Sequence, residues 1–187
     1  MLFVGSMKAA IFLERDGILN FARSQYGQQM PPMTFDEFKV NPFAFAPLRK
    51  LKAAGFTLIA TTNQPAVSQG ILSRWDLDRM HETLQRAFLV DDILVCPHEE
   101  DEYCPCRKPK AGLFSEAAFK WRIEIEQSFV VSDKWQDAEA ARFIGATSLL
   151  VKSPWNGGGH HDFVLPNLTA IVDKILQLQA AAQPSVA

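Results

Sequence analysis

The amino-acid sequence predicts an α/β fold in which helices flank a parallel sheet. Short apolar runs, such as residues 9–13 and 56–60, have the length and composition of strands that are buried on both faces. Stretches with apolar residues at helical spacing separate these runs. Strands that alternate with helices form right-handed βαβ units, whose strands are parallel. The expected architecture is therefore a Rossmann-like sheet with no large cap domain.

The individual elements follow in chain order. Strands are expected at residues 9–13, 56–60, 93–95, 128–131 and 147–151. Helices are expected from about residue 45 to Gly55, after the capping arrangement at Ser73, near 113–121, near 135–144 and from Leu168 onward. Residues 21–42, which contain Gly27 and three prolines, are interpreted as a long irregular loop. The tail from Gln179 is expected to be frayed.

Length and composition restrict the classes of protein. The 187 residues, without a linker or internal repeat, suit one domain over residues 1–187 with its core at about 8–178. A net charge of −2 argues against a general nucleic-acid partner. No apolar run reaches the ~20 residues of a membrane span, and residues 1–7 lack the pattern of a signal peptide, with Met7 as an alternative start. We expect a cytoplasmic monomer.

Polar side chains follow several of the expected strands, where ligands bind in parallel α/β sheets. Glu14 and Asp16 flank Arg15 after the first strand, and such paired carboxylates suit Mg²⁺ beside a phosphate. The run 61–64, Thr-Thr-Asn-Gln, offers hydrogen-bond donors to phosphate oxygens. Each motif alone also fits an ordinary polar loop or turn.

Two later motifs add cations and another carboxylate. Arg107 and Lys108 follow a cysteine-rich loop, and a lysine there can neutralise charge on a transferring group. Asp133 follows the strand at 128–131 and is a candidate Mg²⁺ ligand. Asp137, one helical turn later, also fits a helix N-terminal charge favoured by the dipole.

The cysteine-rich loop predicts a second metal site. Three thiols and one imidazole, the soft ligand set of a closed tetrahedral Zn²⁺ site, come from Cys96, His98, Cys104 and Cys106. The alternative is a loop with three unpaired cysteines, which would expose reactive thiols. Four protein ligands leave no open position, so this zinc is expected to be structural. His160 and His161 follow three glycines and are not assigned to a site.

Taken together, these motifs resemble the haloacid dehalogenase superfamily of phosphatases. The resemblance is most specific to the branch that contains heptose bisphosphate phosphatases and the histidinol-phosphatase domain. It covers residues 8 to about 152 and rests on four stretches: residues 10–20, 62–64 with Gly70, 96–112, and 132–134 with Asp137. The cysteine-histidine loop that runs into Cys-Arg-Lys-Pro is its most specific part.

The resemblance implies a role for each matching residue. Glu14 stands at the nucleophile position, Asp16 is the acid/base, and Thr62 and Lys108 stabilise the phosphoryl group. Mg²⁺ would be held by Glu14, Asp16 and Asp133. The residues expected to contact substrate are Asn63, Arg107 and Lys134.

The nucleophile position departs from the superfamily pattern, in which this residue is aspartate. The extra methylene of Glu14 moves its carboxylate by about one bond length, ~1.5 Å, and an error of that size costs ~10²-fold where in-line attack is required. Two readings therefore stay open. One is a Mg²⁺-dependent phosphomonoesterase for a small phosphorylated metabolite. A sugar bisphosphate such as heptose 1,7-bisphosphate is the expected substrate, although the sequence itself does not choose among heptose bisphosphate, histidinol phosphate and another small phosphate ester. The other is a phosphate-ligand-binding pseudophosphatase.

Overall fold

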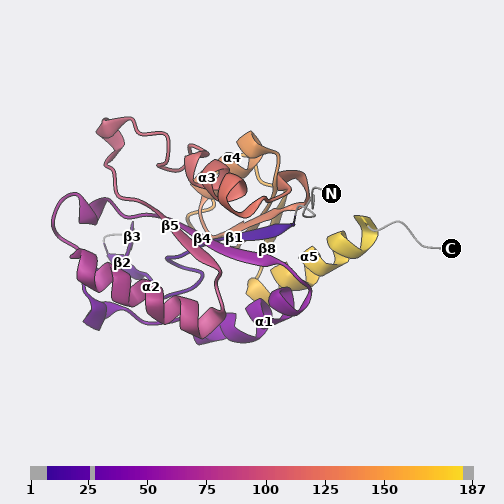
Figure 1. Cartoon of the computed structure of the whole chain (residues 1–187), viewed down its shortest axis with the longest axis horizontal. Coiled ribbons are helices and arrows are strands. Elements are labelled where there is room, and N and C mark those ends of the chain that lie inside the picture. Colours follow the sequence, from indigo (N-terminus) through magenta and orange to yellow (C-terminus); the bar gives the residue numbers. More distant parts are fainter. Residues whose placement is uncertain (1–7, 26–27, 183–187) are drawn as a thin grey trace, which may run out of the picture.

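The computed structural model describes residues 8–25 and 28–182. The alternative start at Met7 and the last five residues of the tail lie outside these ranges. A six-stranded sheet forms the centre of the molecule, with the strand order β5-β4-β1-β6-β7-β8 (Figure 1). All of its neighbouring strands pair in parallel. Its members are β1 (Ala10–Glu14), β4 (Thr57–Asn63), β5 (Asp92–Cys96), β6 (Phe129–Ser132), β7 (Thr147–Val151) and β8 (Phe163–Leu165).

Helices cover both faces of this sheet, as the sequence predicts (Figure 1). The bounds are α1 (Phe45–Ala53), α2 (Arg74–Phe88), α3 (Gly112–Trp121), α4 (Trp135–Ile144) and α5 (Leu168–Ala182). The expected cap of α2 is present, because the Ser73 hydroxyl accepts a hydrogen bond from the Asp76 N–H. Gly55 follows α1 with a φ of +89°, the left-handed conformation that glycine adopts without strain.

Alternating side chains of β1 divide the core into two layers. Ile11 and Leu13 pack with the buried residues of α1, α2 and α5. Ala10 and Phe12 face the other way and pack with α3 and α4. Every residue of β1 is buried, which explains why this strand reads as a continuous apolar run.

The expected irregular loop at residues 21–42 is wrong in part. Its first half forms an antiparallel hairpin of β2 (Arg23–Gln25) and β3 (Gln28–Met30), which the polar composition concealed. The described residues between β1 and α1 otherwise contain only short 3₁₀ turns, so there is no large cap. The expected fraying from Gln179 is also wrong up to Ala182, because α5 continues to that residue.

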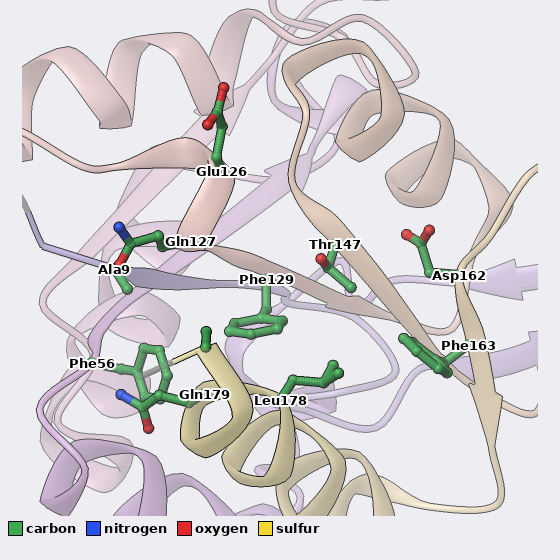
Figure 2. Close-up of a pocket in the computed structure, with 11 residues that line it drawn as sticks. Ala9, Phe56, Glu126, Gln127, Phe129, Thr147, Asp162, Phe163, Leu178 and Gln179 are labelled. Atoms are coloured by element: carbon green, nitrogen blue, oxygen red, sulfur yellow. The ribbon is translucent and has the colours of Figure 1, made fainter. Parts of the chain in front are cut away.

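One cavity, of about 660 Å³, lies away from the polar motifs. It opens at the amino ends of the strands, beside the last turns of α5 (Figure 2). Its apolar lining includes Phe56, Phe129, Phe163 and Leu178. Among the described residues, no helix is both long and apolar enough to cross a membrane.

Candidate active site

The polar motifs meet at the carboxyl ends of the central strands. Glu14 ends β1 and pairs in register with Thr61 of the neighbouring β4. On the other side of β1, β6 ends at Ser132 and is followed by Asp133. A cavity of about 430 Å³ opens here, and Glu14, Asp16, Lys108 and Lys134 are among its lining residues. The structure thus brings the residues that follow these strands together at one edge of the sheet.

Glu14 is held by donors on both of its carboxylate oxygens. One oxygen, Oε1, accepts hydrogen bonds from the N–H groups of Arg15 at 3.1 Å and Asp16 at 3.3 Å, so the side chain folds back onto its own turn. The other, Oε2, contacts the ammonium group of Lys108. Lys108 also donates to the Thr61 carbonyl at 2.9 Å and to Asp137 Oδ1 at 2.6 Å.

Asp137 lies in the first turn of α4, as expected of a helix N-terminal charge, but its side chain also has a buried partner that the sequence did not indicate. Its side chain is 1% exposed and forms a buried ion pair with Lys108. Ser132 Oγ also donates to it, at 2.9 Å. Because Asp137 lies on the first turn of α4, it reaches back under the end of β6 rather than out to solvent.

The pKa values of these groups reflect their shared burial. Burial raises the pKa of Glu14, but the charges of Lys108 and Lys134 outweigh this effect and lower it to about 2. Burial lowers the pKa of Lys108, while Asp137 and Glu14 together hold it above its ordinary value. Burial and the charge of Glu14 raise the pKa of Asp137 to about 7, against the opposing effect of Lys108. Glu14 is therefore ionised at neutral pH, and Asp137 is ionised in part.

Asp16 is surrounded by donors from four side chains. Arg15 reaches both of its oxygens, with Nη2 3.0 Å from Oδ1 and 3.1 Å from Oδ2. Asn20 donates to Oδ1 at 2.9 Å and Gln64 to Oδ2 at 2.7 Å. Thr62 Oγ1 adds a longer contact of 3.4 Å. Thr62, expected to contact the phosphoryl group, is fully buried against Asp16 instead of lining the cavity.

A cluster of oxygen atoms surrounds the Lys134 ammonium group. Lys134 Nζ lies 2.5 Å from the main-chain oxygen of Asp16, 3.2 Å from Asp133 Oδ1 and 3.8 Å from Glu14 Oε1. Asp16 thus offers the cluster its main-chain oxygen, while its carboxylate is engaged elsewhere. Gln29, from β3, donates to Asp133 Oδ2 at 2.8 Å, so the hairpin reaches over the site.

Two further expected substrate contacts also have structural partners. The Asn63 amide pairs with the Lys108 backbone in both directions, accepting from its N–H and donating to its carbonyl, each at 3.1 Å. Arg107 donates through Nη1 to the His98 carbonyl at 3.0 Å. Both residues line the cavity as well. They therefore fix the segment that presents Lys108.

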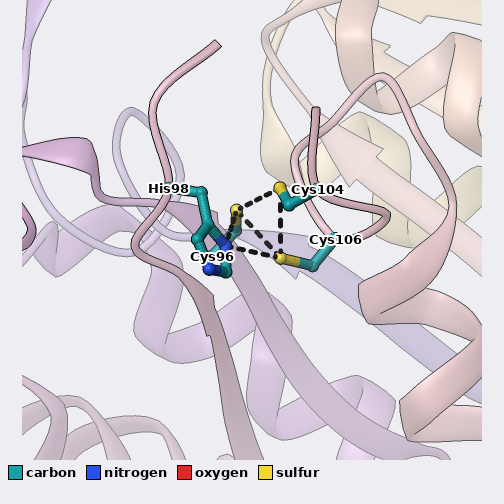
Figure 3. A group of neighbouring side chains, drawn as sticks. All are labelled: Cys96, His98, Cys104 and Cys106. Atoms are coloured by element: carbon teal, nitrogen blue, oxygen red, sulfur yellow. Dashed lines mark hydrogen bonds between the residues drawn. The ribbon is translucent and has the colours of Figure 1, made fainter. Parts of the chain in front are cut away.

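The cysteine-rich loop brings its ligand atoms together (Figure 3). The ligand atoms of the four side chains all lie within 4.8 Å of one another. The sulfur of Cys106 is 3.1 Å from that of Cys96 and 3.5 Å from that of Cys104, and His98 Nδ1 is 3.2 Å from the Cys106 sulfur. Zn–S bonds of about 2.3 Å place tetrahedral ligands ~3.8 Å apart, so this cluster is slightly tighter than a zinc site and can hold the ion.

The sequence did not single out several residues that complete the site. Arg15 lies between the two carboxylates of the first motif, and Gln64 ends the run 61–64. Nothing in their spacing indicated that both bind Asp16. Asn20 ends the stretch 10–20 that carries the family resemblance but received no role there, and Gln29 lies in the segment 21–42 that was interpreted as loop. His81 of α2 lies 3.3 Å from Arg15 Nη1, and the apolar periodicity of that helix gives no signal for it.

Comparison with known proteins agrees with this geometry. Residues 105–178 match a family model described as HAD-hydrolase-like. The chain is 34% identical over 134 residues to the D-glycero-beta-D-manno-heptose-1,7-bisphosphate 7-phosphatase of Helicobacter pylori strain J99, with 68% of this chain and 74% of that one covered. It is 32% identical over 173 residues to the enzyme of the same name from Pseudomonas putida, with 88% and 94% covered.

A solved structure is similar over nearly the whole chain. The D,D-heptose 1,7-bisphosphate phosphatase from B. bronchiseptica, solved with magnesium and phosphate, matches with a TM-score of 0.79 and 28% sequence identity. The match covers 92% of this chain and 99% of that one. The protein described here therefore belongs to the haloacid dehalogenase-like phosphatases, in the family of the heptose bisphosphate phosphatases.

Proposed function

We propose that this protein is a Mg²⁺-dependent phosphatase that hydrolyses a sugar bisphosphate, D-glycero-β-D-manno-heptose 1,7-bisphosphate, at position 7. One observation carries the proposal. The ionised carboxylate of Glu14 stands at the end of β1 in a cavity, paired with a buried Lys108 and two residues before Asp16. The names of the related enzymes supply the substrate.

The reaction runs in two steps with Glu14 as nucleophile. A Glu14 oxygen bonds to phosphorus, the ester P–O bond breaks, and Asp16 gives its proton to the leaving sugar oxygen. Asp16 then takes a proton from water, whose oxygen attacks the glutamyl phosphate and releases inorganic phosphate and Glu14. Lys108 stabilises negative charge on the transferring group. The fold-back of Glu14 onto its own amides takes up part of its extra length, which supports turnover with glutamate.

The oxygen cluster around Lys134 fits a magnesium ion. Mg²⁺ prefers carboxylate and carbonyl oxygens, and Glu14 Oε1, the Asp16 main-chain oxygen and Asp133 Oδ1 already gather around one cation. We assign these three residues as its protein ligands. The ion would neutralise charge on the phosphoryl oxygens. Lys134 would then turn toward the substrate, as its position on the cavity wall allows.

A second cavity adjoins the first and suits the sugar with its other phosphate. Both have volumes of about 430 Å³, and they share the residues Asn63, Arg107, Lys108 and Gln136. The second cavity adds the cation of Lys110, the ring of Trp135 and the opposing carboxylates of Glu99 and Glu100, so that Arg107, Lys108 and Lys110 outnumber its acidic groups. Cationic groups beyond the reacting centre attract a second phosphate, so they favour a sugar bisphosphate over a sugar that carries only the phosphate to be removed.

The remaining parts of the proposal concern the whole protein. Zn²⁺ on the cysteine-rich loop would be structural, since four protein ligands close its coordination. Free thiols suit a reducing compartment, which supports the cytoplasm as the location and carbohydrate metabolism as the setting. We propose a one-domain monomer, which light scattering tests.

Time-resolved phosphate release tests the function. Heptose 1,7-bisphosphate, histidinol phosphate and other small sugar phosphates are compared with Mg²⁺ present and after its removal. The proposal expects Mg²⁺-dependent release with the highest kcat/KM for the heptose bisphosphate. Binding of the bisphosphate without release would favour the pseudophosphatase, and preference for histidinol phosphate would overturn the substrate assignment.

A further inference from the structure

Arg15 is an unusual buried cation. It is the largest fully buried side chain in the described part of the chain, at 0% exposure. A buried guanidinium is costly unless its N–H groups have partners. Its Nε and Nη2 atoms face both oxygens of Asp16. The Nη1 group points elsewhere and needs a partner of its own.

His81 supplies that partner from a distant part of the chain. Its Nε2 atom lies 3.3 Å from Arg15 Nη1, across 66 positions of sequence. Arginine only donates hydrogen bonds, so His81 Nε2 accepts and the imidazole is neutral, with its proton on Nδ1. Burial and the charge of Arg15 lower the pKa of His81 to about 4, despite the opposite effect of Asp16, in agreement with this assignment.

The three residues form a chain that ends at the proposed acid/base. His81 fixes one end of the planar guanidinium, and the other end holds the Asp16 carboxylate through two nitrogens. Gln64 and Asn20 hold the same carboxylate from other directions. We infer that His81 is a positioning residue, which acts through Arg15 to aim the Asp16 carboxylate at the leaving oxygen. This inference rests on the proposed function.

Two substrates with different leaving groups distinguish a positioning role of His81 from a merely structural one. A sugar alkoxide is a poor leaving group and requires the proton from Asp16, whereas p-nitrophenolate departs without one. The ratio kcat/KM reports on the steps up to this departure. In His81→Phe, which lacks an acceptor, kcat/KM should fall ~10-fold or more for heptose bisphosphate but less than about 2-fold for p-nitrophenyl phosphate.

Two matched variants accompany this one. His81→Gln retains an acceptor oxygen and should recover most of the activity on the sugar phosphate. Met80→Ala removes a fully buried neighbour on α2 that packs in a separate apolar cluster, so it loosens the helix without removing the Arg15 partner. Met80→Ala should lower kcat/KM by the same factor for both substrates, or leave it unchanged for both. A similar equal loss in His81→Phe would overturn the inference.

A measurement without turnover keeps the two proposals apart. Absence of wild-type turnover on every ester would refute the proposed function. The ¹⁵N NMR spectrum of the His81 imidazole then still tests the contact. We expect an unprotonated Nε2 and a protonated Nδ1 at neutral pH, and a change at the Arg15 Nη1 signal in His81→Phe but not in Met80→Ala. A protonated Nε2 would contradict the positioning chain.

Discussion

The ammonium group of Lys108 contacts the carboxylate of Glu14, although 94 positions separate the two residues in the chain. Asp137 lies on the other side of the same ammonium group, and the three side chains are at most 4% exposed. Lys108 therefore neutralises two buried carboxylates that would otherwise face one another. Removal of one partner of such a pair is strongly destabilising, because the remaining charge stays buried.

Lys108→Met should therefore lower stability as well as activity. We expect the free energy of unfolding to fall by about 3–5 kcal/mol, as measured by urea denaturation. Adding Asp137→Asn removes one of the two stranded carboxylates and should recover part of the loss. If the double variant is no more stable than Lys108→Met, the Asp137 carboxylate does not destabilise the fold when Lys108 is absent, and the explanation by unpaired buried charge is wrong.

Glu14→Asp should increase turnover. The shorter side chain cannot fold back onto the N–H groups of Arg15 and Asp16 in the same way. It also restores the reach of the aspartate that the superfamily pattern has at the nucleophile position. We expect phosphate release to rise ~10²-fold, equivalent to about 2.7 kcal/mol of barrier. Slower release in Glu14→Asp would instead show that the backbone has adapted to glutamate.

Asp16→Asn is the matched loss-of-function variant. It should abolish release of phosphate from sugar esters in both the wild-type and the Glu14→Asp backgrounds, since leaving-group protonation and water activation both need the carboxyl group. Unaltered release in either background would exclude Asp16 as the acid/base.

The sequence predicted the strand ends better than the contacts between them. Apolar runs located β1, β4 and β6 to within a few residues, because strands buried on both faces carry an unmistakable composition. Local spacing also indicated the cysteine cluster, whose ligands all lie within residues 96–106, at the end of β5 and in the loop that follows it. Two contacts were not predicted from the sequence: the ion pair of Lys108 with Asp137, and the contact of His81 with Arg15. Each joins separate elements through buried polar groups. Periodicity carries no information on such pairs.

Zinc should copurify with the protein at about one equivalent per chain. X-ray absorption should give Zn–S distances near 2.3 Å and a Zn–N distance near 2.0–2.1 Å. Chelation should weaken substrate binding, because the cluster anchors Arg107 and Lys108, while the far-UV CD spectrum stays that of the folded sheet. Protein purified without chelator that contains no zinc would contradict the site.

The neutral state of His81 predicts an acid-sensitive contribution to stability. Its pKa is about 4 in the folded protein against 6.5 for the free side chain, so only the unfolded chain binds the proton between these values. Stability from this residue is therefore complete above about pH 6.5 and is lost as pH falls toward 4. The difference in unfolding free energy between wild type and His81→Gln should shrink or reverse over this window. A difference independent of pH would show that His81 is protonated in the fold.

Gly17→Ala should disrupt the proposed magnesium site directly. Gly17 has a φ of +105°, and a Cβ atom there would lie 2.4 Å from Asp133 Oδ2 and 2.6 Å from Gln29 Nε2. Gly55→Ala is the matched control, because Gly55 has a similar φ of +89° but open space around its Cβ position. Both variants strain the backbone by about 1 kcal/mol or more. Only Gly17→Ala should also displace Asp133, so Mg²⁺ affinity, measured by calorimetry, should fall in this variant and remain near wild type in Gly55→Ala. Equal affinities in the two variants would remove Asp133 from the set of magnesium ligands.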